Sequence, residues 1–590
     1  IVPSNAKEGY LARLVLRRAF RMLKALGIEM PLEDIILTQI KTLRRSFPEL
    51  ENAVDRVVEI VSLEHRRYNE TLLKGGRIIR QDAKRWAEDK PKSVTVGTDR
   101  LIYYYDTHGL PPEFVKEVAT EQESGIVQVD IPENFYSLVA SMHSGAEKDK
   151  EKKGDVEPFV EKMKEKTKTI PATKKLYYDE PSAVEFEATV LDVIDDSVVL
   201  DRTLFFPEGG GQPADTGVLT IKFKDEGRGL NVLDVQEVDG VILHKIENGG
   251  ISKGAVVSGH IDAERRVAHT RHHSATHIVV CAARKVLGEH VWQAGAQKGE
   301  KRARIDITHF KRISDTERRE IEMLANRMVM ENKDIIARFE DRNEAERKYG
   351  FDIYQGGVPP GEKIRIVRIG ADEDVQACAG THCSKTGEVG PIKILRTERI
   401  QDGIERIEYS AGEAAVEAMQ AREELIRKSA STLKVPYEKL PVAVERFFDE
   451  WKQLRKENER LRTEMAELRI GSLKEHAKEI SGVRVIAAVI PDADTKDLMK
   501  MASQLSENKF LTILIGKSIK ENHASVVSSV PAYLKDKINA SVLVKRVCEV
   551  LGGSGGGKAE IAQGGGERVE KVEEAMKEGL GIVKKELIQQ

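Results

Sequence analysis

The stretch "HTRHHSATHIVV", residues 269–280, concentrates histidine in a chain of 590 residues that has only 14 histidines. It lies within residues 265–286, where apolar residues recur at helical spacing and neither Pro nor Gly interrupts them. Side chains four residues apart share one face of a helix, so His273 and His277 are predicted neighbours. His269 and His273 have the same spacing. The pattern therefore predicts a metal-binding pair or, alternatively, ordinary core and surface histidines on a helix.

A second cluster, "CAGTHCSKTGEVG", follows at residues 378–390. Cys378 and His382 are again four apart, and the small residues and glycine between them indicate a tight loop. Zn²⁺ prefers four nitrogen and sulfur ligands in tetrahedral geometry. The helical pair and this loop pair together predict one zinc ion per chain. Cys383 is an alternative ligand to Cys378, although it breaks the four-residue spacing.

Composition bounds the class of protein. The net charge of −3 gives no global signal of nucleic-acid binding, so any RNA contact must come from local basic patches. Four cysteines in so long a chain argue against a disulfide framework and for a reducing compartment. No uninterrupted apolar run reaches the roughly 18 residues that cross a membrane. These features predict a cytoplasmic protein with no membrane partner.

Periodicity predicts a multidomain α+β chain. Helical patterns dominate the first part, and a lysine- and glutamate-rich connector follows it. Alternating apolar and polar residues then predict a small β-barrel, and helices and strands alternate afterwards. The expected segments are a helical domain at 1–143, a charged linker at 144–175, the barrel at 176–264, an α+β core at 265–412, a long helical segment at 413–480 and an α/β module at 481–590.

The helical segment at 413–480 contains a heptad pattern. Apolar residues recur at alternating steps of three and four from Val444 to Leu468, with the polar Asn458 in one core position. Such an Asn often fixes the register of a two-stranded coil, which predicts a homodimer through this segment together with the C-terminal module. The alternative is a helical hairpin inside one chain, packed against residues 413–433.

Five short motifs resemble the editing domain of alanyl-tRNA synthetases. "HSATH" (273–277) and "CAGTH" (378–382) are similar to the zinc signatures usually written HTATH and CGGTH, and the two departures spare the ligands. The other matches, in the family's order, are "FFPEGGGQPADTGVL" (205–219), "HVWQAGAQ" (290–297) and "RIDITHF" (304–310). The resemblance implies a zinc site of His273, His277, Cys378 and His382 that hydrolyses Ser-tRNA(Ala) and Gly-tRNA(Ala).

Two polar residues near these motifs are candidates for the editing pocket. Gln293 falls in the "HVWQ" segment, and Thr203 precedes the glycine-rich motif. A pocket group that pairs with the serine hydroxyl discriminates against alanine, because alanine would leave that group unpaired. Four protein ligands leave no open position on zinc, which favours an anchoring or structural ion over one that activates water.

The first residues resemble the family's tRNA-recognition region. "PSNAKEGYLARLVLRR" (3–18) and "YYDTHGLP" (104–111) are similar to segments that read a G·U wobble pair in the acceptor stem. Carried over, the reading residues are Asn5 and Asp106, which could equally be a helix cap and a turn residue. The remaining candidates for tRNA contact are basic, and plain solvation competes with phosphate binding for them. They are Arg13, Arg17, Arg18 and Lys558.

Lys558 ends the run "GGSGGGK" (552–558), which looks like a phosphate-binding loop. Ala559 stands where Ser or Thr would hold Mg²⁺, so nucleotide hydrolysis is not expected. The resemblance instead implies a small C-terminal module that contacts tRNA. It also predicts a fragment without the N-terminal class II aminoacylation domain, with ATP and Mg²⁺ needed only for that absent domain.

Two other classes compete with an editing enzyme. One is a hydrolase of another ester or amide that uses the same zinc site, which the tRNA-recognition motifs oppose. The other is a non-enzymatic tRNA-binding and dimerisation scaffold in which zinc is structural.

Overall fold

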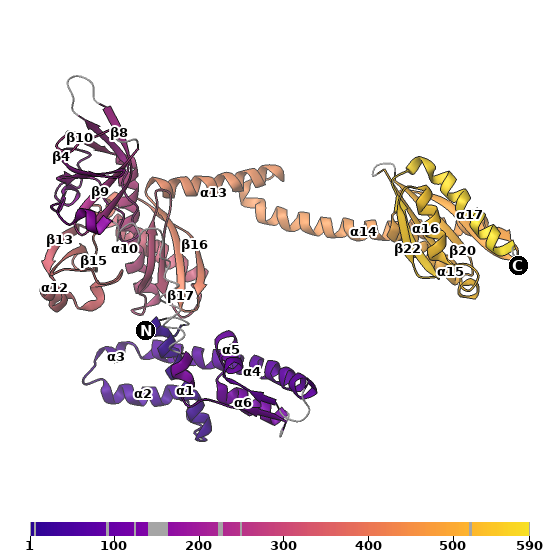
Figure 1. Cartoon of the computed structure of the whole chain (residues 1–590), viewed down its shortest axis with the longest axis horizontal. Helices are drawn as coiled ribbons and strands as arrows, with labels where there is room; N and C mark the ends of the chain where they lie inside the picture. The colour runs from indigo at the N-terminus through magenta and orange to yellow at the C-terminus, as the bar shows by residue number, and fades with distance from the viewer. Residues whose placement is uncertain are drawn as a thin grey trace. The chain divides into compact units, whose positions relative to one another are not determined.

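The computed structural model describes residues 2–4, 7–89, 94–122, 126–139, 163–221, 228–247, 250–518 and 522–588 (Figure 1). The chain divides into two compact units, Ile1–Leu425 and Ile426–Gln590. Both combine helices with sheets, so the multidomain α+β prediction is confirmed at this level. No helix in the described part of the chain is long and apolar enough to cross a membrane.

The first part of unit 1 is mainly helical. Helix α4 is its longest element and contacts α1, α2 and α6. A short parallel sheet of β1 and β2 packs against α4 and α6 through β2. Ile79, Leu101 and Leu110 are completely buried in the core that these elements share. The elements are α1 (Lys7–Ala25), α2 (Leu32–Leu43), α3 (Glu49–Asn52), α4 (Val54–Asp89), β1 (Val94–Val96), α5 (Thr98–His108), α6 (Pro112–Gln122) and β2 (Val127–Val129).

Six antiparallel strands of unit 1 close on themselves in the order β10-β4-β5-β9-β8-β7. Alternate residues point inward, as in the buried–exposed pattern of β4, and Phe205, Leu219 and Val257 fill the interior at 0% exposure. The closing strands are β4 (Glu185–Ile194), β5 (Ser197–Leu200), β7 (Gly217–Ile221), β8 (Arg228–Val238), β9 (Val241–Ile246) and β10 (Val256–Ile261). Beside them lie β3 (Lys174–Lys175), α9 (Leu176–Asp179) and β6 (Arg202–Thr203).

Strand β10 leads directly into α10 (Ala263–Leu287), which carries the histidine stretch. Asp262 caps this helix by accepting a hydrogen bond from the backbone N–H of Arg265 at 3.0 Å. Ala275, Ile278 and Val279 have no exposed surface, because α10 packs against a four-stranded sheet and against α11. A long, almost fully buried helix gives the histidines a rigid base.

The elements around α10 form the α+β core. The four-stranded sheet has the order β11-β12-β17-β16, and a separate three-stranded sheet has the order β13-β14-β15. The loop that follows β15 returns to α10. The bounds are β11 (Gln293–Lys298), β12 (Ala303–Thr308), α11 (Asp315–Met330), β13 (Ile335–Asp341), α12 (Arg342–Tyr349), β14 (Lys363–Ile369), β15 (Asp374–Ala377), β16 (Ile392–Gln401) and β17 (Ile404–Ala411).

Unit 2 is a six-stranded sheet, order β18-β19-β20-β21-β23-β22, with helices on both faces. Helices α16 and α17 cover one face and α15 the other, so every residue of β20 from Leu511 to Gly516 is buried. The elements are α14 (Leu440–Glu475), β18 (Lys478–Ile480), β19 (Val483–Pro491), α15 (Thr495–Glu507), β20 (Leu511–Ser518), β21 (His523–Ser529), α16 (Ala540–Val550), β22 (Ser554–Gly557), β23 (Ile561–Gly566) and α17 (Val572–Ile588). Helix α13 (Glu413–Thr432) spans the division between the units.

Candidate metal centre

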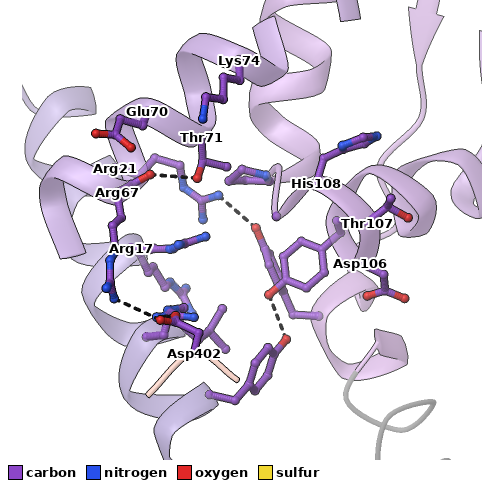
Figure 2. A pocket seen from close by; sticks show the side chains of 18 of the residues that line it. Arg17, Arg21, Arg67, Glu70, Thr71, Lys74, Asp106, Thr107, His108 and Asp402 are labelled. Atoms are coloured by element: carbon purple, nitrogen blue, oxygen red, sulfur yellow. Dashed lines mark hydrogen bonds and ion pairs between the residues drawn. The ribbon is translucent and has the colours of Figure 1, made fainter. Parts of the chain in front are cut away.

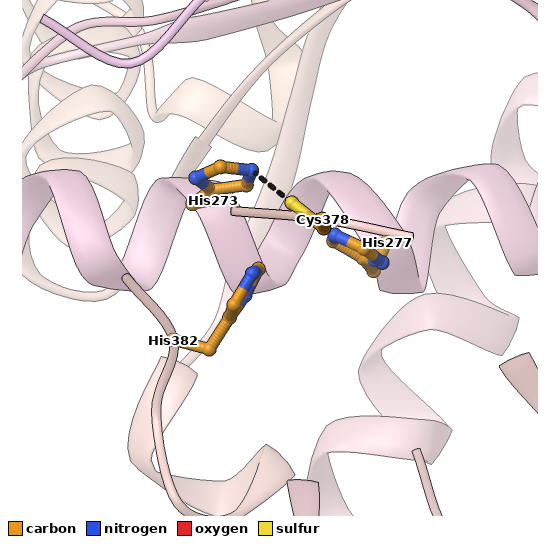
Figure 3. Close-up of side chains that lie close together, drawn as sticks. All are labelled: His273, His277, Cys378 and His382. Carbon is orange, nitrogen blue, oxygen red and sulfur yellow. Dashed lines mark hydrogen bonds between the residues drawn. The ribbon is translucent and has the colours of Figure 1, made fainter. Parts of the chain in front are cut away.

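The two predicted ligand pairs meet in one place. His273 and His277 project from one face of α10, and the loop after β15 brings Cys378 and His382 against them (Figure 3). One ligand atom from each of the four lies within 4.8 Å of the others. Tetrahedral Zn²⁺ with these donors places ligand atoms about 3.3–3.8 Å apart, so side-chain rotations that bring the most distant atoms closer by about 1 Å would complete the geometry.

Gln212 fixes the protonation of His273. Its side-chain nitrogen donates to Thr381 Oγ1 at 2.9 Å, so its oxygen faces the imidazole. That oxygen lies 2.7 Å from His273 Nδ1 and also accepts the Thr381 backbone N–H at 3.1 Å. Nδ1 must therefore carry the proton, which leaves the lone pair on Nε2, 3.2 Å from Cys378 Sγ. This lone pair is the one that a metal ion at the centre of the cluster needs.

Asp374 holds the ring of His277 through the corresponding nitrogen. Its carboxylate lies 3.1 Å from His277 Nδ1 and is held by the Gln376 side-chain amide at 2.9 and 3.0 Å. Burial opposes a charge on His277, but the hydrogen bonds to Asp374 and Cys378 outweigh it and raise its pKa to about 9. A histidine bonded to a carboxylate through one nitrogen and facing a shared centre with the other is a common arrangement at zinc sites.

Cys378 lies in an environment that favours the thiolate. Although burial opposes a charge there, the neighbouring His273 and His382 lower the pKa of its thiol well below the usual value. The His382 Nε2 atom is buried and has no hydrogen-bond partner among the described residues. Burial lowers the pKa of His382 to about 4, so this ring is neutral near pH 7. A thiolate among imidazoles suits Zn²⁺.

The loop that carries Cys378 and His382 is held tightly. Arg365 donates to the backbone oxygens of Cys378 at 3.0 Å and Gly380 at 2.8 Å, and the Tyr178 hydroxyl donates to that of Ala379 at 2.7 Å. A Cβ atom at Gly380 would lie 1.9 Å from His273 Cε1. Glycine is therefore required here, because the loop passes directly over the imidazole.

The structure decides between the alternatives that the sequence leaves open. Cys383 is outside the cluster; its backbone N–H donates to Ser274 Oγ at 3.0 Å, and burial raises the pKa of its thiol to about 11. His269 is also outside it. The structure thus selects the His273–His277 pair and Cys378, as the resemblance implies.

The cluster opens into a cavity of about 1340 Å³, a volume sufficient for the end of a nucleotide chain. Gln293 lies in its wall, as the prediction for a pocket residue requires, and so do Trp292 and Lys298. Thr203 does not. Its side chain has 0% exposure inside the barrel, where its hydroxyl bonds His244 Nε2 at 2.8 Å and accepts the Phe205 N–H at 3.0 Å. The prediction that Thr203 contacts substrate is therefore wrong, because adjacency to the glycine motif in sequence does not place it in the cavity.

A second cavity, about 710 Å³, lies among the N-terminal helices. Figure 2 shows Arg17, Arg21, Arg67 and Lys74 of α1 and α4 on one side and Asp106 of α5 on the other. Arginine and lysine outnumber carboxylates in its lining by seven to three. The cations are Arg13, Arg17, Arg18, Arg21, Arg67, Lys74 and Arg399; the carboxylates are Glu70, Asp106 and Asp402.

The predicted tRNA-contact residues at this cavity differ in exposure and in ion pairing. Arg13 is 6% exposed and is ion-paired with Glu64 at 3.0 Å and with Asp402, so these carboxylates compete with a phosphate for it, and its phosphate contact stays a prediction. Arg17 also pairs with Glu64, at 2.7 Å, but borders the cavity. Arg18 and Asp106 are exposed at its rim. Asn5 lies outside the described residues.

The glycine run near Lys558 serves a packing role. The backbone of β22 pairs with β23, so its amides are partly used in a sheet. A Cβ atom at Gly564 would lie 2.5 Å from Gly555 Cα and 2.6 Å from Cys548 Sγ. Glycines thus allow the two strands and α16 to approach closely. Lys558 itself is exposed at the turn between the strands.

Comparison with known proteins agrees with this site. Residues 1–265 match the family model "tRNA synthetases class II (A)", residues 364–408 match the "Threonyl and Alanyl tRNA synthetase second additional domain", and residues 482–585 match the "DHHA1 domain". The second match includes Cys378 and His382. These matches relate the first part of the chain to class II aminoacyl-tRNA synthetases and residues 364–408 to a domain of threonyl- and alanyl-tRNA synthetases.

Its relatives narrow this further. The alanine–tRNA ligase of Methanosarcina barkeri is 48% identical over 588 residues, which is 99% of this chain and 61% of that protein. That of Pyrococcus furiosus is 46% identical over 585 residues, or 98% of this chain and 61% of that protein. The chain is thus similar to alanyl-tRNA synthetases over almost its whole length. The solved C-Ala domain of Aquifex aeolicus alanyl-tRNA synthetase is 27% identical, with a TM-score of 0.17, and covers 19% of this chain and 96% of that one.

The chain spans about 61% of the length of the curated relatives that it matches. One prediction is corrected by these comparisons. The class II model matches residues 1–265, which contradicts the interpretation of the chain as a fragment lacking the class II aminoacylation domain. The assignment of ATP and Mg²⁺ only to an absent domain is withdrawn for the same reason.

Proposed function

We propose that the four-residue cluster binds one Zn²⁺ and that the adjoining cavity hydrolyses serine or glycine esters of alanine tRNA. The observation that carries this proposal is the donor set. Gln212 and Asp374 hold two imidazoles through Nδ1 so that their Nε2 atoms face a thiolate, and the His382 Nε2 atom has no hydrogen-bond partner among the described residues. Packing of the four side chains without a metal ion would not require this orientation.

The residues of the chain divide the chemistry between them. Bound Zn²⁺ would supply a Lewis acid that also anchors the substrate. Gln293 in the cavity wall offers an amide to the hydroxyl of a seryl group. Alanine has no such hydroxyl and would leave the amide unpaired, which favours hydrolysis of the serine ester. His273 and His277 are almost completely buried, which keeps bulk water away from their side of the site.

For the whole polypeptide we propose the activity of its relatives, ligation of alanine to tRNA(Ala) with ATP. The proposed parts are a tRNA-recognition domain at 1–143, a linker at 144–175, the barrel and zinc core of the editing domain at 176–264 and 265–412, a dimerisation segment at 413–480 and a tRNA-binding module at 481–590. The change from strands to α10 at residue 263 supports the division inside the editing domain. Lys558 is the proposed phosphate contact of the last module.

Homodimerisation is supported by the surface of α14. The predicted heptad positions Phe447, Leu454 and Leu468 are 58%, 70% and 77% exposed. An apolar stripe of this length on a water-exposed helix has a large free energy to gain from burial. We propose that a second copy of the chain covers it, with Asn458 fixing the register.

Arg18 provides a test of the proposed tRNA surface. It is exposed at the basic cavity and has no partner among the described residues, so it is available to a phosphate. Arg18→Ala should weaken tRNA(Ala) binding and lower the slope of log K against log salt by about 1. The matched control is Arg85→Ala, a cation on α4 that is 72% exposed and outside the cavity. Equal affinity and equal slope for both variants would contradict the assignment.

Metal removal tests the editing proposal itself. Dialysis of the 590-residue chain against a chelator should abolish hydrolysis of Ser-tRNA(Ala), and stoichiometric Zn²⁺ should restore it. Metal content by mass spectrometry and circular dichroism are measured on the same samples. Hydrolysis by the metal-free chain with folding intact would contradict a role of Zn²⁺ in the reaction, whereas a zinc-loaded chain that hydrolyses nothing would favour the non-enzymatic scaffold with a structural zinc. Hydrolysis of simple amino-acid esters but not of Ser-tRNA(Ala) would favour a hydrolase of another ester.

A further inference from the structure

Lys298 is a buried cation beside the proposed zinc site whose role the proposed function does not explain. It ends β11, is 2% exposed, and lines the same cavity as His273 and Cys378. Its ammonium group donates to the backbone oxygen of Gly210. No carboxylate pairs with it in the described parts of the chain, although burial of an unpaired charge is costly. Two of its three N–H donors are therefore available to a ligand.

The glycine-rich loop fixes where this ammonium lies. The Lys298 backbone N–H donates to Gly211 O at 2.7 Å, in addition to the bond from Nζ to Gly210. A Cβ atom at Gly211 would lie 2.1 Å from Ala296 O, so the loop lies flat on β11. The same loop continues to Gln212, which orients His273. Lys298 and the cluster are thus held in a fixed relation by one segment.

Other charges in the cavity wall do not neutralise Lys298. Asp306 is engaged by Arg406 through two hydrogen bonds of 2.6 and 2.9 Å. The Glu289 side chain is 86% exposed. Burial lowers the pKa of Lys298 and the nearby Cys378 opposes that shift. A protonated Lys298 ammonium at this position favours a substrate atom that becomes negative.

We propose that Lys298 is a catalytic residue whose ammonium group donates a hydrogen bond to the carbonyl oxygen of the scissile ester. When water attacks the carbonyl carbon, a new C–O bond forms and the electron pair of the carbonyl moves to its oxygen. As the oxyanion collapses, the bond to the ribose oxygen breaks, the ribose oxygen takes the proton that the attacking water gives up, and the free amino acid leaves. An ammonium repels the α-ammonium of the substrate, so the carbonyl side of the amino acid faces Lys298. This proposal rests on the proposed editing function.

The test is single-turnover hydrolysis of Ser-tRNA(Ala) by Lys298→Met, which keeps the length of the side chain and removes its donors. We expect the rate constant at saturating enzyme to fall about 10²–10³-fold, as for loss of one oxyanion donor, with half-saturation changed less than threefold. Lys298→Arg should recover part of the rate. The matched control is Lys301→Met, an exposed lysine outside the cavity on the same hairpin.

Zinc content and circular dichroism separate this role from a structural one. A normal rate constant in a zinc-loaded Lys298→Met variant overturns the proposal. So does a variant in which only the enzyme concentration at half-saturation rises, because that would indicate a role in ground-state binding only. If Lys298→Met loses zinc or fold, Lys298→Arg decides: a folded, zinc-loaded variant with no more activity than Lys298→Met overturns it. A wild-type chain without hydrolysis refutes the proposed function itself, which is a different result.

Discussion

Replacing His273 with alanine is expected to remove zinc and editing activity together. The substitution should disturb no surface contact, because His273 is 2% exposed and its two ring nitrogens face Gln212 and Cys378. Loss of a partner of a zinc ligand typically costs 10–100-fold in metal affinity or activity. Loss of the ligand itself should exceed this, so we expect hydrolysis of Ser-tRNA(Ala) to fall by about 10³-fold or more. Single-turnover rates and zinc content are measured on the same preparation.

A graded series makes this prediction sharper. Gln212→Leu removes the acceptor that orients His273 and leaves all four ligands, so it should fall between wild type and His273→Ala in both measurements. His260→Ala is the matched control, since His260 is an exposed histidine whose side chain pairs with Glu185 at 3.3 Å. Unchanged activity of His273→Ala at normal zinc loading would refute the assignment of the ligand.

The zinc ligands could be predicted because their signal is local. The two ligands of each pair are four residues apart in the sequence. The helix and the tight loop that carry them are predicted from the residues beside them. The residues that orient the pairs carry no such signal. Gln212 lies 61 residues before His273, and Asp374 lies 97 residues after His277. Only the return of the barrel loop and of β15 to α10 brings them there.

The arginines of the first helix show a second limit of prediction from the sequence. The basic face of the first helix is visible in the sequence, but its partners are not. Glu64 belongs to α4 and Asp402 to the turn between β16 and β17, and both contact Arg13. A pattern of arginines therefore predicts a positive surface, whereas burial against distant acids decides which arginines remain on it. Arg18 stays exposed and Arg13 does not.

Breaking the buried pair of Arg266 and Asp215 is expected to cost about 3–5 kcal/mol of unfolding free energy. Arg266 Nε lies 3.1 and 3.0 Å from the two carboxylate oxygens, and the two side chains are 6% and 0% exposed. Asp215 also accepts the Phe206 N–H at 2.7 Å. Asp215→Ala would leave the guanidinium buried without its counter-charge, and that uncompensated charge is the main part of the cost.

The effect should reach the zinc site, because Asp215 anchors the loop that carries Gln212 to the first turn of α10. Urea unfolding, followed by fluorescence of Trp292 with Trp86 and Trp451 replaced by Phe, reports on this part of the chain. Arg202→Ala is the control, since Arg202 is 50% exposed in its pair with Asp201 and should cost less than about 1 kcal/mol. The double variant Arg266→Met with Asp215→Leu should regain most of the lost stability, because no unpaired charge remains. Equal losses in Asp215→Ala and Arg202→Ala would show that this pair does not hold the barrel to α10.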